Sequence, residues 1–393
     1  MVYEKITKNY VWSPNSWRKK HVLQNIKYKD INLLKFQLQI LEQSANLFSQ
    51  QAILNCKSLL ADIVDKKYFI LQAGDCAETI KDKPYSVTYA DNMSHFILEL
   101  SNNLQYNIKQ KIIPFARMAG QMAKPRSLKG DDTDAYLYRG DLINSFETNV
   151  KDNEPDAQRL LHAYKYSKQL IDYVQEQNYN LYFCHECFLL PYEQALVRKV
   201  KNQYYVSSAH MLWVGERTRD IDCAHIEFCR GISNPIGVKI GAEISPAELL
   251  KLCDILNPDN EKGKLCFIVR MGAAKIAHNL PTLINIINKA NKNVIWLCDP
   301  MHGNNVIYKN YKTRFISAIK SETKSFFDIH RKLGSYGTGI HLELTYENVT
   351  ECLENENLYD TKWQNYKSYC DARLNANQAR DFIKFLSTII IGC

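Results

Sequence analysis

The chain has 393 residues, of which 46% are hydrophobic and 23% are charged, and this composition is typical of a globular protein with a packed core. No run approaches the roughly 20 consecutive apolar residues that a membrane span needs, and the start lacks the apolar segment of a signal peptide. The 12 cysteines are scattered, which argues against a secreted disulfide scaffold. We therefore expect a soluble, cytoplasmic protein with mostly reduced thiols.

The formal net charge of +8 is concentrated near the N-terminus, since residues 1–72 hold 11 basic and 5 acidic side chains. A basic segment of this kind could contact nucleic acid or a membrane surface. However, no aromatic-basic module or zinc-finger spacing accompanies the charge. We therefore predict neither nucleic acid nor a membrane as a partner.

Short apolar runs typical of strands alternate along the chain with longer segments of helical spacing. The expected strands are residues 68–72, 111–116, 181–185, 211–215, 238–241, 265–270, 294–298 and 340–345. The expected helices include residues 86–104, 156–176, 246–256, 280–290 and 311–333. Eight alternations of strand and helix predict an α/β fold of the (β/α)8 barrel type.

The segment before the first expected strand has its own pattern. The apolar residues with helical spacing in it are Leu33, Leu34, Leu38 and Leu41. We therefore divide the chain into an N-terminal helical extension, residues 1–66, and a catalytic barrel, residues 67–393. The extension is expected to pack against the barrel or a partner subunit.

Nearly every expected strand is followed by a charged or metal-capable side chain, and barrel active sites are built from the loops at the carboxyl ends of the strands. Six of these residues are cations: Arg117, Lys124, Arg126, Arg217, Lys239 and Arg270. So many cations at one end of a barrel are stable only when anionic ligands neutralise them. Two phosphate groups would do so. The sequence has no Walker loop and no strand-to-helix glycine motif, so nucleotide binding is unsupported.

The same end of the expected barrel receives residues of a second kind, Cys76, His302 and Glu343. A thiolate, an imidazole and a carboxylate together suit a divalent first-row metal better than magnesium. A single residue of this kind is most often structural, but chance would scatter such residues over both ends of the strands. The whole set therefore predicts an enzyme active site.

Several sequence motifs, taken in order, resemble those of the class II (plant-type) 3-deoxy-D-arabino-heptulosonate 7-phosphate (DAHP) synthases. The motifs are LQAGDCAE at 71–78, GQMAKPRS at 120–127, YRGD at 138–141, WVGERTR at 213–219, NPIGVK at 234–239, DPMHGN at 299–304, VTEC at 349–352 and CDARLN at 370–375. The resemblance runs from about Trp12 to the C-terminus. It implies a metal-dependent condensation of phosphoenolpyruvate with erythrose 4-phosphate and water, which releases phosphate at the entry to the shikimate pathway.

The resemblance also implies roles for individual residues. The metal ligands would be Cys76, His302, Glu343 and Asp371. The ligands of phosphoenolpyruvate would be Arg117, Glu216, Arg217, Lys239, Arg270 and His302. Lys124, Arg126 and Ser127 would face erythrose 4-phosphate, and Lys124 would reach between the two substrates. The residues expected to be catalytic are Lys124, Glu216, Lys239 and His302. Either Glu216 or a metal-bound water would activate the attacking water.

The expected cofactor is a divalent metal ion, with Mn²⁺ or Co²⁺ first and Zn²⁺ or Fe²⁺ next. The expected assembly is a homo-oligomer, a dimer or a tetramer. Ala73, Ala372 and the pair Glu354 and Asn355 depart from the usual pattern, which has glycine or proline at these positions. The missing glycines and the short chain resemble compact members that serve secondary metabolism, such as phenazine biosynthesis. A barrel of about 250 residues and the N-terminal segment leave mainly loops and not a separate effector domain, so we expect weak or no inhibition by phenylalanine, tyrosine and tryptophan.

Two alternatives to this enzyme remain open at this point. One is the amino variant of the reaction, in which an imino sugar phosphate replaces erythrose 4-phosphate. The other is a catalytically silent partner subunit that binds a sugar phosphate without turnover. Loss of a metal ligand would favour the silent subunit, and the sequence keeps all four expected ligands.

Overall fold

The computed structural model describes residues 11–63, 68–81, 85–126, 137–146, 153–355 and 363–391. Eight parallel strands form a closed barrel in the order β1-β12-β9-β8-β7-β6-β3-β2, so each strand pairs with its neighbours in the chain and the last strand pairs with the first. The barrel strands are β1 Tyr68–Gly74, β2 Lys111–Arg117, β3 Tyr182–Glu186, β6 Met211–Val214, β7 Ile236–Ile240, β8 Leu265–Val269, β9 Ile295–Cys298 and β12 Gly339–Glu343. This topology confirms the predicted barrel.

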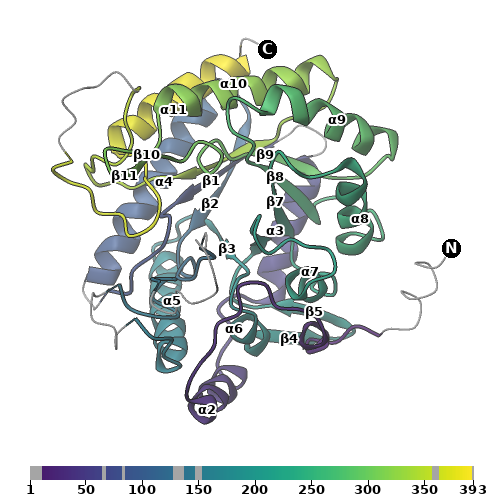
Figure 1. Cartoon of the computed structure of the whole chain (residues 1–393), viewed down its shortest axis with the longest axis vertical. Helices are drawn as coiled ribbons and strands as arrows, with labels where there is room; N and C mark the ends of the chain where they lie inside the picture. The colour runs from purple at the N-terminus through teal and green to yellow at the C-terminus, as the bar shows by residue number, and fades with distance from the viewer. Residues whose placement is uncertain are drawn as a thin grey trace.

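Helices follow the barrel strands and surround them (Figure 1). They are α4 Tyr85–Ile108, α5 Gln158–Glu176, α6 Leu190–Ala195, α7 Ala224–Cys229, α8 Pro246–Leu256, α9 Ile276–Lys289, α10 Ile316–Lys332 and α11 Ala376–Ile391. The start of α8 shows how local sequence sets a boundary. The Ser245 side chain accepts a hydrogen bond from the Glu248 backbone N–H, and Pro246 occupies the first turn, where its missing N–H costs nothing.

Two antiparallel hairpins interrupt the regular alternation, and the sequence did not predict them. One is formed by β4 Val197–Val200 and β5 Gln203–Val206, and the other by β10 Val306–Tyr308 and β11 Tyr311–Thr313. The expected helix 311–333 was therefore wrong at its start, since α10 begins at Ile316. The turn of the second hairpin places Lys309 and Asn310 at positive φ, the conformation that two-residue hairpin loops require.

The N-terminal residues form the short 3-10 helix η1 Ser16–Lys19 and the helices α2 Ile31–Glu42 and α3 Gln50–Ile63. Figure 1 shows α2 outside the barrel, where it contacts α5 and α6. By contrast, the apolar face of α3 joins one buried cluster with inward-facing side chains of the barrel strands. Thus α3 closes the amino-terminal end of the barrel and leaves the carboxyl end for the loops.

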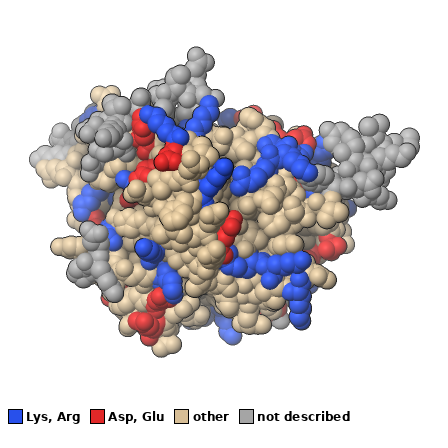
Figure 2. Space-filling model, turned by 90° about the horizontal axis from the view of Figure 1, so that it is seen from below, with Lys and Arg blue, Asp and Glu red and all other residues tan. Residues whose placement is uncertain are grey.

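The molecular surface shows no single region of positive charge in the view of Figure 2. On that face, lysine and arginine side chains lie scattered among aspartate and glutamate. Among the described residues, no helix combines the length and the apolar character needed to cross a bilayer.

The contact of α3 with the barrel interior gives a stability prediction. Leu60 is 1% exposed within this cluster, so Leu60→Ala should lower the free energy of unfolding by about 2–5 kcal/mol. Urea denaturation measures this change. Ser58→Ala on the exposed side of the same helix is the control and should stay within about 0.5 kcal/mol of the parent. An equal loss in both variants would contradict the role of α3 as a plug.

Candidate active site

The candidate site lies at the carboxyl end of the barrel, because most of the predicted residues end a strand or lie in the segment that follows it. Arg117 ends β2 and Glu343 ends β12, whereas Lys239 lies within β7. Cys76 follows β1, and Asp371 lies in the segment between β12 and α11. The other predicted residues in the described part of the chain follow β2, β6, β8 and β9: Lys124, Arg126, Glu216, Arg217, Arg270 and His302. Ser127 lies outside the described residues.

The structure brings the four expected metal ligands together. Ligand atoms of Cys76, Glu343 and Asp371 lie within 4.8 Å of one another. His302 joins them, since its Nε2 atom lies 3.0 Å from the Glu343 Oε1 atom. These residues come from four separate parts of the chain, and only closure of the barrel can assemble them.

The ammonium group of Lys124 lies among three of these ligand atoms. Its Nζ atom is 2.7 Å from the Cys76 sulfur, 2.8 Å from the Asp371 Oδ2 atom and 3.2 Å from the Glu343 Oε1 atom. Burial alone lowers the pKa of Lys124, but the charges of Asp371, Cys76 and Glu343 raise this pKa well above its ordinary value. The three ligand atoms therefore surround a position that favours a cation. Their combination of sulfur and carboxylate oxygen fits a divalent first-row metal.

Glu343 is the most strongly held member of the group. Its side chain is fully buried, and besides Lys124 and His302 it contacts Arg117 at 3.0 Å and Arg314 at 2.7 Å. Burial raises the pKa of Glu343, but the positive neighbours outweigh burial and hold this pKa well below its usual range. Sequence reasoning missed Arg314, which follows β11 in a region that was predicted to be helix.

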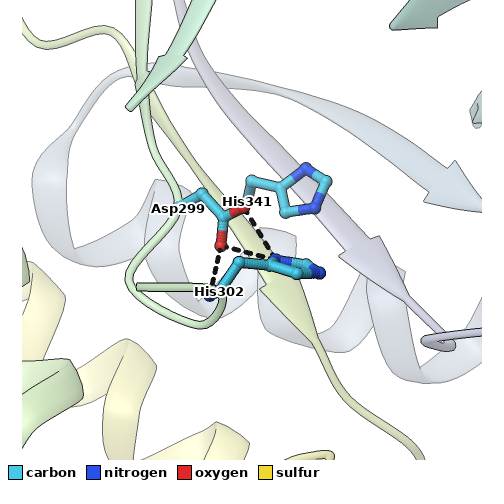
Figure 3. Close-up of side chains that lie close together, drawn as sticks. All are labelled: Asp299, His302 and His341. Atoms are coloured by element: carbon cyan, nitrogen blue, oxygen red, sulfur yellow. Dashed lines mark hydrogen bonds and ion pairs between the residues drawn. The ribbon is translucent and has the colours of Figure 1, made fainter. Parts of the chain in front are cut away.

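Asp299, His302 and His341 form a second group, in which Asp299 orients the imidazole of His302 (Figure 3). The His302 Nδ1 atom lies 2.8 Å from an Asp299 carboxylate oxygen, while its Nε2 atom faces Glu343. A carboxylate that accepts the Nδ1 proton leaves the Nε2 lone pair available to a metal. A carboxylate bonded to one ring nitrogen in this way is common for histidines that bind a metal through the other nitrogen.

His341 takes no part in the ligand cluster, because both ring nitrogens already have partners. The Nδ1 atom lies 2.6 Å from the side-chain amide oxygen of Gln72, and the Nε2 atom faces Arg117 at 3.0 Å and Lys239 at 3.3 Å. Burial first, then the charges of Lys239 and Arg117, hold the pKa of His341 well below its ordinary value. Lys239 also lies 3.0 Å from Asp299. This second group therefore already surrounds an ammonium.

Three guanidinium groups lie nearer the opening of the barrel than the buried cations. Arg126 and Arg270 are partly buried, and Arg217 is exposed. Although the Arg217 side chain reaches solvent, partial desolvation by the surrounding protein is the main effect that lowers its pKa, and the charges of Arg270 and Arg126 lower this pKa further. Each of the three guanidinium groups has the planar donors that suit an anionic group such as phosphate.

The N-terminal extension reaches the loop that carries Lys124 and Arg126, a contact that sequence analysis did not predict. The Gln24 side chain donates to the Arg126 carbonyl at 2.7 Å and accepts from the Arg126 backbone N–H at 2.8 Å. It also accepts from the Arg139 guanidinium at 3.1 Å. A glutamine in a segment without secondary structure has no periodic signal, so only the structure reveals this role.

Among the described residues, two carboxylates besides Glu343 at this end of the barrel have a buried oxygen without a hydrogen-bond partner. These atoms are Oε1 of Glu186, at the end of β3, and Oε2 of Glu216, after β6. Burial raises the pKa of Glu186, although Lys239 and Lys124 act in the opposite direction. Each of the two oxygens is free to accept a hydrogen bond from a substrate or a water.

The fold and the site together define a class of protein, a (β/α)8 barrel with a buried cluster of metal-capable side chains and several cationic side chains at the carboxyl end of its strands. Comparison with known proteins gives the family. The model of the class-II DAHP synthetase family matches residues 12–178 and 173–387. The chain belongs to this family.

Curated relatives support the same assignment. The chain is 33% identical to a phospho-2-dehydro-3-deoxyheptonate aldolase of Neurospora crassa, over 94% of this chain and 92% of that protein. It is 32% identical to a Streptomyces coelicolor protein of the same name, over 93% and 95% of the two chains. It is 34% identical to the Mycolicibacterium smegmatis protein named phospho-2-dehydro-3-deoxyheptonate aldolase AroG, over 82% and 83%.

The ligand cluster gives a prediction about metal binding. Cys76→Ser should weaken the affinity for Mn²⁺ or Co²⁺ by at least tenfold, because the variant replaces the soft thiolate ligand with a weaker hydroxyl. Isothermal titration calorimetry on metal-stripped protein measures the affinity. The control is Cys253→Ser, a buried cysteine on α8, which should bind metal like the parent. Equal affinity in both variants would remove Cys76 from the ligand set.

Proposed function

We propose that this chain catalyses the reaction of its family, the condensation of phosphoenolpyruvate with erythrose 4-phosphate and water to DAHP and phosphate. The observation that carries the proposal is the ligand cluster of Cys76, Glu343, Asp371 and His302 below a mouth of guanidinium groups. The cluster would hold the metal that activates the aldehyde of erythrose 4-phosphate, and the guanidinium groups would bind the phosphates of the two substrates. The reaction needs both.

We propose Mn²⁺ or Co²⁺ as the metal, with Zn²⁺ or Fe²⁺ as further ions that this donor set accepts. A metal held by these four residues supplies a Lewis acid for the aldehyde carbonyl. The remaining chemistry belongs to the protein. Lys124 lies between the ligand cluster and the loop of Arg126, so its ammonium can donate to the oxygen that gains charge as the new carbon–carbon bond forms.

The cations hold phosphoenolpyruvate in register. The charge of Arg270 acts on Arg217, and these two side chains would bind the phosphate of phosphoenolpyruvate. The more deeply buried Lys239 and Arg117 would bind its carboxylate. The Arg117 Nε atom is buried without a hydrogen-bond partner. Arg126 and Ser127 would hold the phosphate of erythrose 4-phosphate. Fixing both substrates in this way removes much of the entropic barrier to their reaction.

Water completes the reaction. The methylene carbon of phosphoenolpyruvate bonds to the aldehyde carbon, the water oxygen bonds to the central carbon, and phosphate later leaves with the electrons of its C–O bond. The proton released by the water needs an acceptor near the central carbon. Glu216 is the acceptor we propose, because one of its oxygens lacks a partner. Glu186, with the same property and a raised pKa, is the second carboxylate in reach of this region.

The test is phosphate release from phosphoenolpyruvate, measured with and without erythrose 4-phosphate and with and without Mn²⁺. Release should require all three components and stop on addition of a chelator. Binding of phosphoenolpyruvate without any release would instead identify a silent sugar-phosphate-binding subunit.

The Arg270 guanidinium gives a sharper prediction. Arg270→Lys keeps the charge but loses the planar pair of donors that fits a phosphate, so the KM for phosphoenolpyruvate should rise at least tenfold while the KM for erythrose 4-phosphate changes little. Steady-state kinetics with each substrate varied in turn measure both values. Lys275→Arg is the control, since Lys275 pairs with Glu243 on the surface. Unchanged kinetics in Arg270→Lys would exclude a clamp at this position.

We propose a specialised role for the enzyme, in secondary rather than primary aromatic metabolism. Every described helix and strand belongs to the barrel, the N-terminal segment or one of the two hairpins, and a barrel alone takes about 250 residues. The described elements therefore include no separate domain that would bind an inhibitor. We therefore expect less than twofold inhibition by 1 mM phenylalanine, tyrosine or tryptophan in the phosphate-release assay. Strong inhibition by any of them at lower concentration would favour a feedback-regulated, housekeeping role.

The broader setting is also proposed. We expect residues 1–66 to act as an extension of a catalytic barrel, residues 67–393, in a cytoplasmic homo-oligomer, either a dimer or a tetramer. Sedimentation analysis of the purified chain tests the assembly.

A further inference from the structure

Glu322 is a buried carboxylate on α10 that the proposed reaction does not use. Its side chain lies in the interior, with 0% of the residue exposed. It reaches the loops that follow β8 and β9. These two loops carry Arg270 and His302.

The hydrogen bonds of Glu322 connect the two loops. One carboxylate oxygen accepts from the backbone N–H groups of Met271 at 2.9 Å and Gly272 at 2.8 Å. The other oxygen accepts from the Asn304 side-chain amide at 2.6 Å. Both oxygens are therefore used as acceptors, and each of the three partners is a donor.

The orientation of the Asn304 amide is fixed by further contacts. Its oxygen accepts from the Ala273 backbone N–H at 3.1 Å, and its nitrogen also donates to the Pro300 carbonyl at 2.8 Å. Rotation of the amide would lose both bonds. Glu322 must therefore accept on both oxygens, which a carboxylate does and an amide or a protonated acid does not.

The two loops also touch each other directly. A Cβ atom on Gly303 would lie 2.2 Å from the Gly272 nitrogen, and Gly272 has a φ of +83°. The Arg270 guanidinium donates to the His302 carbonyl at 2.7 Å. The relative position of the two loops thus sets the position of the Arg270 side chain against His302.

Stability alone would not favour a carboxylate here. Burial raises the pKa of Glu322 to about 8, and the charge of Asp299 adds to this effect. The donors from Met271, Gly272 and Asn304 act in the opposite direction, and because all three face the oxygens, it is the hydrogen-bond geometry that favours the ionised form. A buried polar network of this kind is often no more stable than an apolar replacement. The network instead fixes the position of the loop after β8 relative to the loop after β9.

We propose that Glu322 is a positioning residue, which fixes the loop of Arg270 against the loop of His302 so that phosphoenolpyruvate is held next to the metal site. The proposal rests on the proposed function. Glu322 itself touches no substrate and acts through the two loops.

The test is Glu322→Gln, which keeps the shape of the side chain but turns one acceptor into a donor. The NH2 group of the new side chain must face either the two backbone N–H groups or the NH2 group of Asn304. In both orientations a donor then meets a donor, which is repulsive. The KM for phosphoenolpyruvate should rise at least tenfold, with less than a twofold change in the KM for erythrose 4-phosphate. A merely structural role would lower the amount of active enzyme and leave both KM values unchanged.

The control is Asp328→Asn on the same helix, where a partly exposed carboxylate pairs with Lys324 and Arg331. It should behave as the parent. A second variant, Asn304→Asp, tests the contact from the other loop, because it places two carboxylates against each other, and it should raise the same KM. It also decides the question if Glu322→Gln does not fold.

Direct binding separates this proposal from the proposed function. Isothermal titration of phosphoenolpyruvate, with Mn²⁺ present, should show at least tenfold weaker binding to Glu322→Gln than to the parent. A parent protein that binds phosphoenolpyruvate but releases no phosphate would overturn the proposed reaction and leave the positioning role standing. Equal phosphoenolpyruvate affinity and KM in the parent and in the folded variant would overturn the positioning role.

Discussion

The fully buried carboxylate of Glu343, surrounded by cationic side chains, is the interaction on which the rest of the site depends. A carboxylate in the interior is very costly unless positive groups and hydrogen bonds compensate it. Here Arg117, Arg314, Lys124 and His302 all lie within 3.2 Å of its oxygens. Arg117 and Lys124 belong to β2 and the loop after it, and His302 and Arg314 to the segment between β9 and α10, so the charge of Glu343 draws two βα segments toward one point.

The two ends of the barrel serve different purposes. At the amino-terminal end, α3 covers the interior with apolar side chains such as Leu60 and Ile63, and hydrophobic burial supplies the stability. At the carboxyl end, the buried residues are largely ionised groups whose burial costs stability. The apolar end therefore offsets the cost of the polar end, as is usual in barrel enzymes.

The sequence predicted the elements and residues that have a local signal. Apolar runs such as the one in β8 are recognisable because strands buried on both faces are almost wholly hydrophobic, and Cys76 and His302 stand directly after such runs. Gln24 and Arg314 had no such signal, since their roles arise from contacts with residues more than 25 positions away. The hairpin of β10 and β11 was missed because its strands have only three residues each, too few for periodicity to show.

Glu322 has a counterpart on the other side of the barrel mouth, and the pair suggests how a barrel can hold flexible loops in one arrangement. Glu78, in the loop after β1, accepts hydrogen bonds from the backbone N–H groups of Ala119, Gly120 and Gln121, which belong to the loop after β2. Burial raises the pKa of Glu78 to about 7, so this carboxylate, like Glu322, is costly to bury. In each case a carboxylate binds consecutive backbone N–H groups, which have no other partner in a tight turn. Backbone donors cannot rotate away as side chains can, so a single buried carboxylate fixes the path of a whole loop. The cationic side chains on those loops then remain in place even though they repel one another.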